Sequence, residues 1–234
     1  MVVHQRIVAE DAAALARLAA EWLAAEIRVA VALRDACALA LAGGGTPRPV
    51  YEALAERPLE DPVPWDRVQV FFGDERAVPP DDPESNFRMA SEALLQRVPI
   101  PGPNVHRMEA EAVDADAAAA RYGGLLPQAL DVLVLGVGAD GHTASLFPGS
   151  PALRERSRRV VPATAPKPPQ RRLTITPPVI AAARRIVVLA AGSDKAGPVA
   201  RALKAAGTPD EVPARLARDG VWFLDRAAAR LLTD

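Results

Sequence analysis

Residues 131–148 read DVLVLGVGADGHTASLFP. The run from Val132 to Val137 is apolar and does not alternate with polar residues, which is typical of a strand that is covered on both faces. A glycine-rich turn with one aspartate and one histidine follows it directly. The stretch therefore predicts a buried strand that ends in a polar loop.

Apolar runs of the same kind recur along the chain, at Ala38 to Ala42, Val68 to Phe72, Ile186 to Ala191 and Val221 to Leu224. Segments with helical spacing or helix-forming composition lie between and around them, at Asp11 to Arg28, Val50 to Ala55, Phe87 to Gln96, Asp194 to Lys204 and Ala227 to Leu232. Strands and helices in alternation build a parallel sheet with helices on both faces. We expect an α/β fold, a doubly wound and mostly parallel sheet of the Rossmann-like type, in a single domain spanning residues 1–234.

Two proline-rich stretches interrupt this alternation, at Arg57 to Trp65 and at Val161 to Pro169. The second can form neither a helix nor a central strand, because proline has no backbone N–H to donate. Strand-like sequence resumes directly after it. We therefore expect an ordered loop at the edge of the sheet and not a linker between domains.

Charge and cysteine content limit the functional classes. The 28 basic and 29 acidic residues nearly cancel, which excludes the basic surplus that draws a whole protein to nucleic acid or to an anionic membrane. No apolar run is long enough to span a bilayer, and Met1 to Glu10 lacks the apolar core of a signal peptide. The single cysteine, Cys37, cannot form an internal disulfide. We expect a cytoplasmic protein.

The residues that follow the strands are candidates for a site, because ligands of open α/β sheets bind at the carboxyl ends of the strands. After the first of the apolar runs comes GGGTP at 43–47. Glycines allow the backbone to approach an anion closely, and the N–H groups of a helix start point toward it. The segment is a candidate phosphate-binding loop. The alternative is a tight turn with Pro47 at the first helical position.

After the run Val68 to Phe72 comes GDER at 73–76, with three charged residues in succession. Such a cluster is usually a solvated loop. Downstream, Ser85 and Asn86 are suited to cap a helix that begins near Phe87, which would turn this loop back over the edge of the sheet.

The histidine of the opening stretch, His142, lies two residues from Asp140. An imidazole that takes up a proton near neutral pH, beside a carboxylate at the ligand end of a sheet, has what a general base needs. A metal site would need companion ligands, and the only other histidines are His4 and His106. We therefore expect acid–base chemistry and no metal.

Five motifs occur in a characteristic order: GGGTP at 43–47, FGDER at 72–76 with SN at 85–86, DGHTASLFP at 140–148, RLTIT at 172–176 and GSDK at 192–195. Together they resemble the 6-phosphogluconolactonase family, over most of the chain. The resemblance implies hydrolysis of 6-phospho-D-glucono-1,5-lactone in the oxidative pentose phosphate pathway, by a monomer or small homo-oligomer. This substrate is an activated ester, so neither a covalent nucleophile nor a cofactor is required.

The resemblance also implies roles for individual residues. His142 would activate a water molecule, and Arg76 would stabilise the oxyanion. Either Asp140 or Asp74 would orient the imidazole; the sequence leaves this open, together with the use of Glu75. The phosphate would be held by a further set that combines loop residues with two cations, Gly44, Gly45, Thr46, Arg172 and Lys195. Arg172 is preferred over Arg171 because of its position before Leu173.

Two other functions share this type of fold. The glucosamine-6-phosphate deaminases have a similar histidine loop that continues with a catalytic glutamate, whereas residues 143–148 contain no acid here. Sugar-phosphate sensor domains of bacterial regulators bind without turnover, and usually accompany a DNA-binding helix-turn-helix for which the N-terminal region has little room. The lactonase interpretation is the stronger one.

Overall fold

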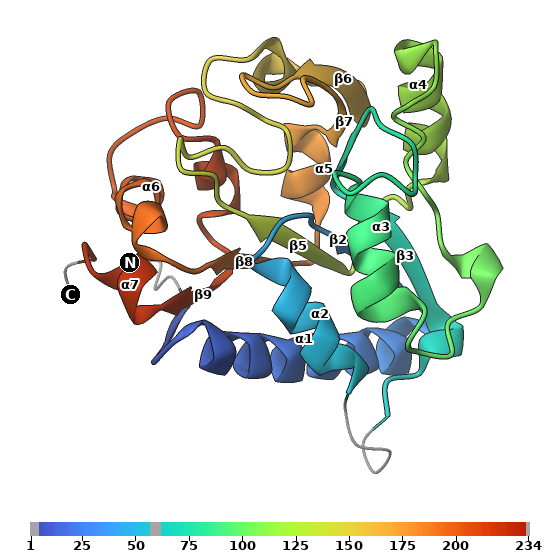
Figure 1. The fold of residues 1–234 in the computed structure, drawn as a ribbon, viewed down its shortest axis with the longest axis horizontal. Coiled ribbons are helices and arrows are strands. Elements are labelled where there is room, and N and C mark those ends of the chain that lie inside the picture. The colour runs from blue at the N-terminus through green and yellow to red at the C-terminus, as the bar shows by residue number, and fades with distance from the viewer. Residues whose placement is uncertain (1–4, 57–61, 233–234) are drawn as a thin grey trace.

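The computed structural model describes residues 5–56 and 62–232 (Figure 1). Its centre is a six-stranded sheet with the order β1-β9-β8-β5-β2-β3, in which every neighbouring pair is parallel. Its strands are β1 (Arg6–Ala9), β2 (Cys37–Leu41), β3 (Val68–Phe72), β5 (Val132–Gly136), β8 (Arg185–Ala190) and β9 (Val221–Asp225). The five predicted apolar runs are all strands of this sheet, and the predicted mostly parallel α/β fold is confirmed.

Five of the six strands, all except β1, supply side chains to two hydrophobic cores, one on each face of the sheet. In β2, Leu39 and Leu41 pack into the core that contains α1 (Ala12–Arg34), α2 (Pro47–Ala55) and α3 (Asn86–Ala90). Ala38 and Ala40 of the same strand pack into the core that contains α4 (Ala115–Leu125), α5 (Pro177–Ala182), α6 (Ala196–Leu203) and α7 (Arg226–Ala229). Burial on both faces explains why the strands are apolar without alternation.

Several helices differ from their predicted bounds. Helix α1 continues six residues past the predicted end, to Arg34, and closes at Asp35 in the left-handed conformation. The segment predicted as one helix from Phe87 to Gln96 is α3 followed by a turn of π-helix, Ser91–Leu95. Ser85 caps α3 as predicted, since its side chain accepts a hydrogen bond from the N–H of Arg88 at 3.1 Å. Short 3-10 helices lie at Trp65–Arg67, Gly102–Asn104, Pro151–Arg154, Ser193–Lys195 and Pro213–Ala217.

A second, antiparallel sheet with the order β4-β7-β6 lies beside the carboxyl end of the main sheet (Figure 1). Its strands are β4 (Asp74–Arg76), β7 (Arg171–Ile175) and β6 (Val160–Thr164). The prediction of a loop from Val161 to Pro169 is therefore wrong for its first residues. Strand β6 tolerates Pro162 because it is an edge strand, where a missing donor costs no central ladder bond. Of the other proline-rich stretch, residues 57–61 lie outside the described residues.

Cys37 is the first residue of β2 and is completely buried. Burial raises the pKa of its thiol to about 12. Within the described ranges, no helix is both long enough and apolar enough to cross a membrane.

Candidate active site

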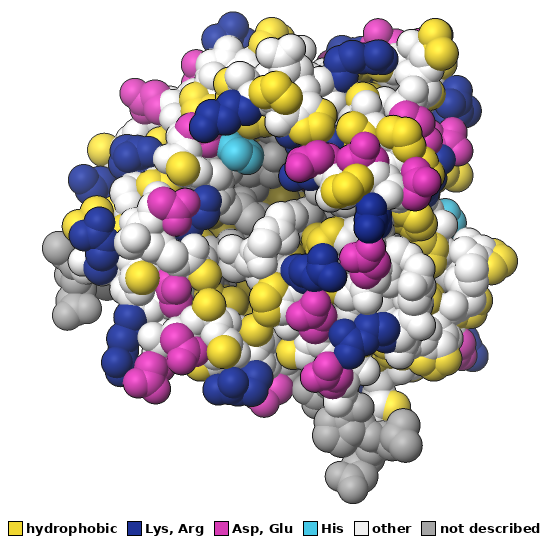
Figure 2. Space-filling model, in the orientation of Figure 1, with side chains coloured by type: hydrophobic (Ala, Val, Ile, Leu, Met, Phe, Trp, Pro, Cys, Tyr) yellow, Lys and Arg dark blue, Asp and Glu magenta, His cyan; other side chains and the backbone are white. Residues whose placement is uncertain are grey.

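A cavity of about 620 Å³ opens at the carboxyl ends of β2 and β5. The winding of the main sheet reverses between these two strands, because β3 lies on one side of β2 and the later strands lie on the other. A ligand site is expected at such a reversal. Figure 2 shows the hollow near the centre of this face, with basic side chains and a histidine around it. The cavity is lined by all nine predicted site residues: Gly44, Gly45, Thr46, Asp74, Arg76, Asp140, His142, Arg172 and Lys195.

The glycine loop joins β2 to α2 and forms one wall of the cavity. Gly44 has a φ of 102°, a conformation that side-chain-bearing residues rarely adopt. At Gly43 a Cβ atom would lie 1.8 Å from Oδ1 of Asn86, so only glycine allows this close approach. The Thr46 side chain makes no capping hydrogen bond to α2, and Pro47 begins the helix. The segment therefore contains the tight turn that was the alternative prediction, and it also lines the cavity, as a phosphate-binding loop would.

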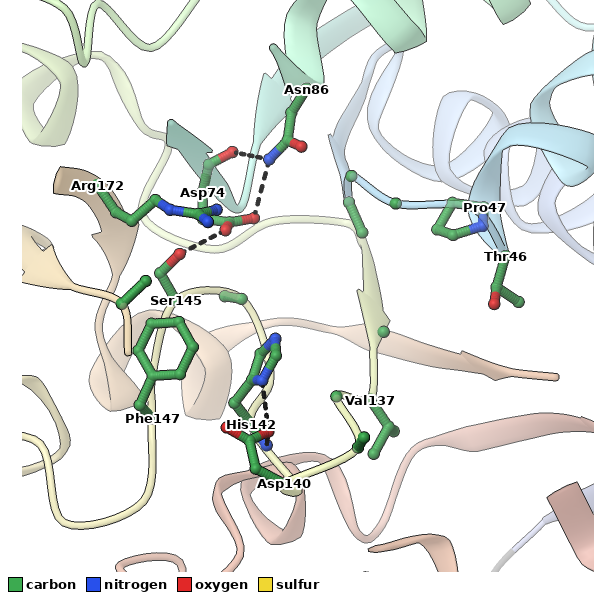
Figure 3. Close-up of a pocket in the computed structure, with 18 of the residues that line it drawn as sticks. Thr46, Pro47, Asp74, Asn86, Val137, Asp140, His142, Ser145, Phe147 and Arg172 are labelled. Atoms are coloured by element: carbon green, nitrogen blue, oxygen red, sulfur yellow. Dashed lines mark hydrogen bonds and ion pairs between the residues drawn. The ribbon is translucent and has the colours of Figure 1, made fainter. Parts of the chain in front are cut away.

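The histidine loop follows β5 and presents an acid–base pair. Oδ1 of Asp140 lies 2.5 Å from Nδ1 of His142 and accepts the backbone N–H of the same residue at 3.1 Å (Figure 3). Burial alone would raise the pKa of Asp140, but these hydrogen bonds outweigh it and lower the pKa to about 2. A carboxylate on Nδ1 favours the tautomer that leaves Nε2 as a proton acceptor. Of the two aspartates that the sequence left open, Asp140 is the one that contacts the imidazole.

The imidazole is held in place from two sides. A Cβ atom at Gly138 would lie 2.0 Å from Nδ1 of His142, so the ring rests against bare backbone there. The Phe147 ring packs against it with a centroid distance of 4.7 Å and an angle of 47° between the ring planes. These contacts leave the ring only one-third exposed, with a side-chain exposure of 33%. Packing and the Asp140 bond together preset its orientation toward the cavity.

Asp74 belongs to a different cluster. Its Oδ2 accepts a hydrogen bond from the Ser145 hydroxyl at 2.6 Å, and its Oδ1 accepts one from Nδ2 of Asn86 at 3.3 Å (Figure 3). The same Nδ2 donates to the backbone carbonyl of Asp74 at 2.9 Å. The cluster ties the histidine loop, which carries Ser145, to β4 and to the start of α3.

Glu75 is buried, with 3% exposure, and organises the segment that returns from β4 to α3. Its carboxylate accepts the backbone N–H groups of Arg76, Asn86 and Phe87 at 2.7 to 2.8 Å. The Ser85 hydroxyl donates to it at 3.1 Å. Burial raises the pKa of Glu75, although these bonds oppose the shift. The interpretation of residues 73–76 as a solvated loop is therefore wrong, because Asp74 and Glu75 are both buried.

Arg76 and Arg172 stand opposite each other in the β4–β7 ladder, so both side chains lie on one face of the small sheet. Nη1 of Arg76 donates to the backbone carbonyl of Glu84, while its Nε is buried without a hydrogen-bond partner among the residues described. Nε of Arg172 donates to the carbonyl of Pro169 at 2.7 Å. Burial, followed by the charge of Arg76, lowers the pKa of Arg172. Two guanidinium groups thus share one wall of the cavity.

Alternation along β7 separates Arg172, which lines the cavity, from Arg171, which is exposed and does not line it. Figure 3 shows Arg172 beside Asp74, with Thr46 on the far side of the cavity. Lys195 also lines the cavity, and its Nζ lies 2.9 Å from Oδ2 of Asp194. The residues predicted to hold the phosphate therefore line more than one wall.

Three further polar residues line the cavity that received no site role from the sequence: Asn86, Ser145 and Lys167. The sequence predicts Asn86 at a helix start, but its hydrogen bond to Asp74 depends on tertiary structure. Ser145 lies within the histidine motif without a local pattern that marks it. Lys167 comes from the proline-rich loop between β6 and β7, whose position over the cavity no local signal predicts.

No group of three or more histidine, cysteine or acidic residues that could hold a metal ion occurs in residues 5–56 and 62–232. The cavity combines an oriented imidazole, two guanidinium groups, two lysines and a glycine loop at a helix start. Such a site suits proton transfer on a small anionic substrate, which defines the class as an α/β enzyme of anionic metabolites.

Comparison with known proteins identifies the family within this class. The model of the family "Glucosamine-6-phosphate isomerases/6-phosphogluconolactonase" matches residues 10–223. The chain belongs to this family, as the five motifs predict. A 6-phosphogluconolactonase of Streptomyces coelicolor is 41% identical, over 97% of this chain and 94% of its own. One of Synechocystis is 40% identical, over 88% of this chain and 89% of its own.

Solved structures agree with the fold. A 6-phosphogluconolactonase from Leishmania guyanensis superposes with a TM-score of 0.86 at 30% identity, covering 99% of this chain and 100% of its own. A monomeric glucosamine-6-phosphate deaminase also reaches a TM-score of 0.86, at 23% identity over 97% of this chain and 100% of its own. At that identity the second likeness concerns the fold alone.

Proposed function

We propose that this chain is a 6-phosphogluconolactonase, which hydrolyses 6-phospho-D-glucono-1,5-lactone to 6-phospho-D-gluconate in the oxidative pentose phosphate pathway. The observation that carries the proposal is the histidine loop. It holds an Asp140–His142 pair at the cavity, and no acid follows in residues 143–148. Relatives about 40% identical over most of the chain bear this enzyme's name.

In the proposed reaction, His142 acts as the general base. Its Nε2 takes a proton from a water molecule while the water oxygen bonds to the lactone carbonyl carbon. The bond from that carbon to the ring oxygen then breaks, and the imidazolium returns the proton to the ring oxygen. Asp140 keeps Nδ1 protonated and stabilises the imidazolium, a contribution supported by its 2.5 Å contact.

Arg76 stabilises the negative charge that develops on the carbonyl oxygen. Its side chain is only 22% exposed, and its buried Nε has no hydrogen-bond partner within the described chain. A cation that is fixed before the reaction and shielded from water acts strongly where charge appears in the transition state. Glu75 holds the backbone N–H of Arg76 at 2.7 Å, which steadies this residue.

The phosphate end of the substrate binds to Gly44, Gly45, Thr46, Arg172 and Lys195 in the proposed complex. The loop offers backbone N–H groups at the start of α2, and Thr46 has a hydroxyl free of helix capping. Lys195 adds a point charge, and Arg172 adds a planar fork from the wall across from Thr46.

Replacement of Lys195 tests the phosphate assignment. Lys195→Ala should raise KM for the phosphorylated lactone by roughly 10-fold or more, with little change for unphosphorylated gluconolactone. Lys204→Ala is the matched control, because Lys204 is exposed and does not line the cavity. Equal losses on both lactones would show that Lys195 does not contact the phosphate.

Two substrates test the activity itself. In weak buffer, the protein should accelerate acid release from freshly made phosphorylated lactone above the spontaneous rate, which a sensor domain does not do. Given glucosamine 6-phosphate, it should release no ammonia above the blank, because residues 143–148 contain no acid. Catalytic ammonia release would assign the chain to the deaminase branch instead.

We also propose that residues 1–234 act as one cytoplasmic domain, a monomer or small homo-oligomer, without nucleic-acid or membrane partners. Two hydrophobic cores on one sheet support a single domain. A buried free Cys37 supports a reducing, cytoplasmic location, and the nearly balanced charges support the absence of nucleic-acid and membrane partners.

A further inference from the structure

The chain contains two tyrosines, and both use their hydroxyl groups in the same way. Tyr51 and Tyr122 are buried, with 0% and 3% exposure. Both bond to the backbone at the end of a parallel strand. Tyr51 belongs to α2 and Tyr122 to α4, and these helices cover opposite faces of the main sheet.

The Tyr51 hydroxyl makes two hydrogen bonds to the backbone of Ala42. It accepts the N–H of Ala42 at 2.9 Å and donates to the carbonyl oxygen of the same residue at 2.9 Å. Ala42 is the first residue after β2 and directly precedes the Gly43–Thr46 loop. The hydroxyl therefore takes the place of a strand partner at the point where the chain leaves the sheet.

The Tyr122 hydroxyl is hydrogen-bonded to the end of the neighbouring strand, β3. It accepts the N–H of Phe72 at 2.7 Å and lies 3.3 Å from the carbonyl oxygens of Phe72 and His106. Phe72 is the last residue of the edge strand β3, and Gly73 separates it from β4, which carries Asp74 and Arg76.

The two contacts lie next to each other. Leu41 and Phe72 are register partners in the β2–β3 ladder, so Ala42 and Phe72 lie at adjacent points of the carboxyl edge. One leads into the loop proposed to bind phosphate, and the other into the segment proposed to meet the reacting carbonyl. Burial raises the pKa of both tyrosines, so both keep the proton that they donate.

We propose that Tyr51 and Tyr122 are positioning residues with separate tasks. Tyr51 fixes the start of the Gly43–Thr46 loop and thereby the binding of the phosphate. Tyr122 fixes the start of β4 and thereby the placement of Arg76. The inference rests on the proposed function for the assignment of the two ends of the substrate.

Two single-atom deletions test this division, and each serves as the control for the other. Tyr51→Phe and Tyr122→Phe each leave a buried backbone N–H without its partner, so both should lower the melting temperature by roughly 2–10 °C. Tyr51→Phe should raise KM for the phosphorylated lactone by about 5-fold to 20-fold, with kcat and the rate on unphosphorylated lactone within about 2-fold. Tyr122→Phe should instead lower kcat on both lactones by about 5-fold to 20-fold.

Binding of inorganic phosphate, measured by calorimetry, separates this inference from the proposed function because it needs no turnover. Tyr51→Phe should bind phosphate more weakly than the wild type, and Tyr122→Phe should bind it equally well. If the wild type fails to hydrolyse the lactone, the proposed function is overturned, but the difference in phosphate affinity between the two variants can still be measured.

Equal changes in both variants, or a loss of stability without any kinetic change, would overturn the division of tasks. All kinetics should be recorded well below both melting temperatures. If either variant fails to fold, hydrogen exchange on the wild type decides: the amide of Ala42, bonded to Tyr51, and that of Phe72, bonded to Tyr122, should be as protected as those within β2. Rapid exchange at Phe72 would overturn the role of Tyr122. Rapid exchange at Ala42 would overturn the role of Tyr51.

Discussion

Asp140 and Asp74 both line the cavity, yet their surroundings differ in kind. Asp140 is 41% exposed at its side chain and bonds to the ring and backbone of one titratable residue, His142. Asp74 is 8% exposed and has both carboxylate oxygens bonded, to Ser145 and Asn86. In the proposed mechanism the first carboxylate serves proton transfer, whereas the second joins three segments of the cavity wall.

The largest expected effect lies on the Asp140 side of this comparison. His142→Asn should lower kcat by roughly 10² to 10⁴, with a much smaller change in KM, because the proposed transfer of the water's proton to the imidazole is lost. Wild-type activity should fall as the pH is lowered, since a protonated imidazole has no free lone pair. The residual rate of His142→Asn should lack this acid limb, after correction for spontaneous hydrolysis. A variant that keeps wild-type kcat or the same limb would move the base to Asp74 or Asp140.

Replacement of Arg76 should have the next largest effect. Arg76→Ala should lower kcat by roughly 10² to 10³, because the charge it stabilises exists fully only in the transition state. Unlike His142→Asn, this variant should keep the acid limb of the pH profile. Arg171→Ala is the matched control, since Arg171 is exposed on the neighbouring strand and does not line the cavity. A similar loss in both variants would indicate a general electrostatic effect and not oxyanion stabilisation.

Asp140→Asn should lower kcat by roughly 10-fold to 100-fold, because an amide no longer selects the Nδ1-protonated tautomer. The lowered pKa of Asp140 means that its ionised form is favoured by folding. Its contribution to stability is therefore present above the ordinary value of 3.8 and is lost as the pH falls toward about 2. Acid unfolding followed by circular dichroism should show wild type and Asp140→Asn converging in that range. An unchanged kcat would remove Asp140 from the mechanism.

Asp74→Asn should have the smallest effect on kcat, at most a few-fold, and a larger effect on folding. The new amide has one acceptor oxygen and so cannot accept hydrogen bonds from both the Ser145 hydroxyl and Nδ2 of Asn86, and we expect a loss of about 1–3 kcal/mol in the free energy of unfolding. Urea denaturation measures it. Ser145→Ala removes the hydrogen bond between Ser145 and Asp74 from the Ser145 side. The double variant should therefore lose less unfolding free energy than the sum of the two single losses. A kcat loss as large as that of His142→Asn would contradict the contrast between the aspartates.

The sequence predicts the main sheet because its strands are buried on both faces and are therefore continuous apolar runs. It misses strand β1 because only Ala9 of its four residues is buried. Of the second sheet it predicts only the strand-like sequence that is β7; it misses β4, which consists of three charged residues, and β6, which contains Pro162. These strands are defined by their partners, and pairing between distant segments leaves no local pattern.

The same distinction applies to the site. Strand ends are local features, and all nine predicted residues line one cavity, although Arg172 lies within β7 and not after a strand. The partner of each side chain is not a local feature. Asp140 and not Asp74 contacts the imidazole, and Glu75 accepts three backbone N–H groups. Both facts depend on how β4, α3 and the histidine loop fold together.

The buried position of Cys37 makes it a natural reporter for the strand that leads into the glycine loop. As the only cysteine of the chain, at the first position of β2, it would give any thiol reagent a single, defined target. With a thiol pKa of about 12 and no exposure, it should react only in molecules whose β2 has opened. The labelling rate, compared with that of the unfolded chain, therefore measures the free energy of opening at this strand without any mutation.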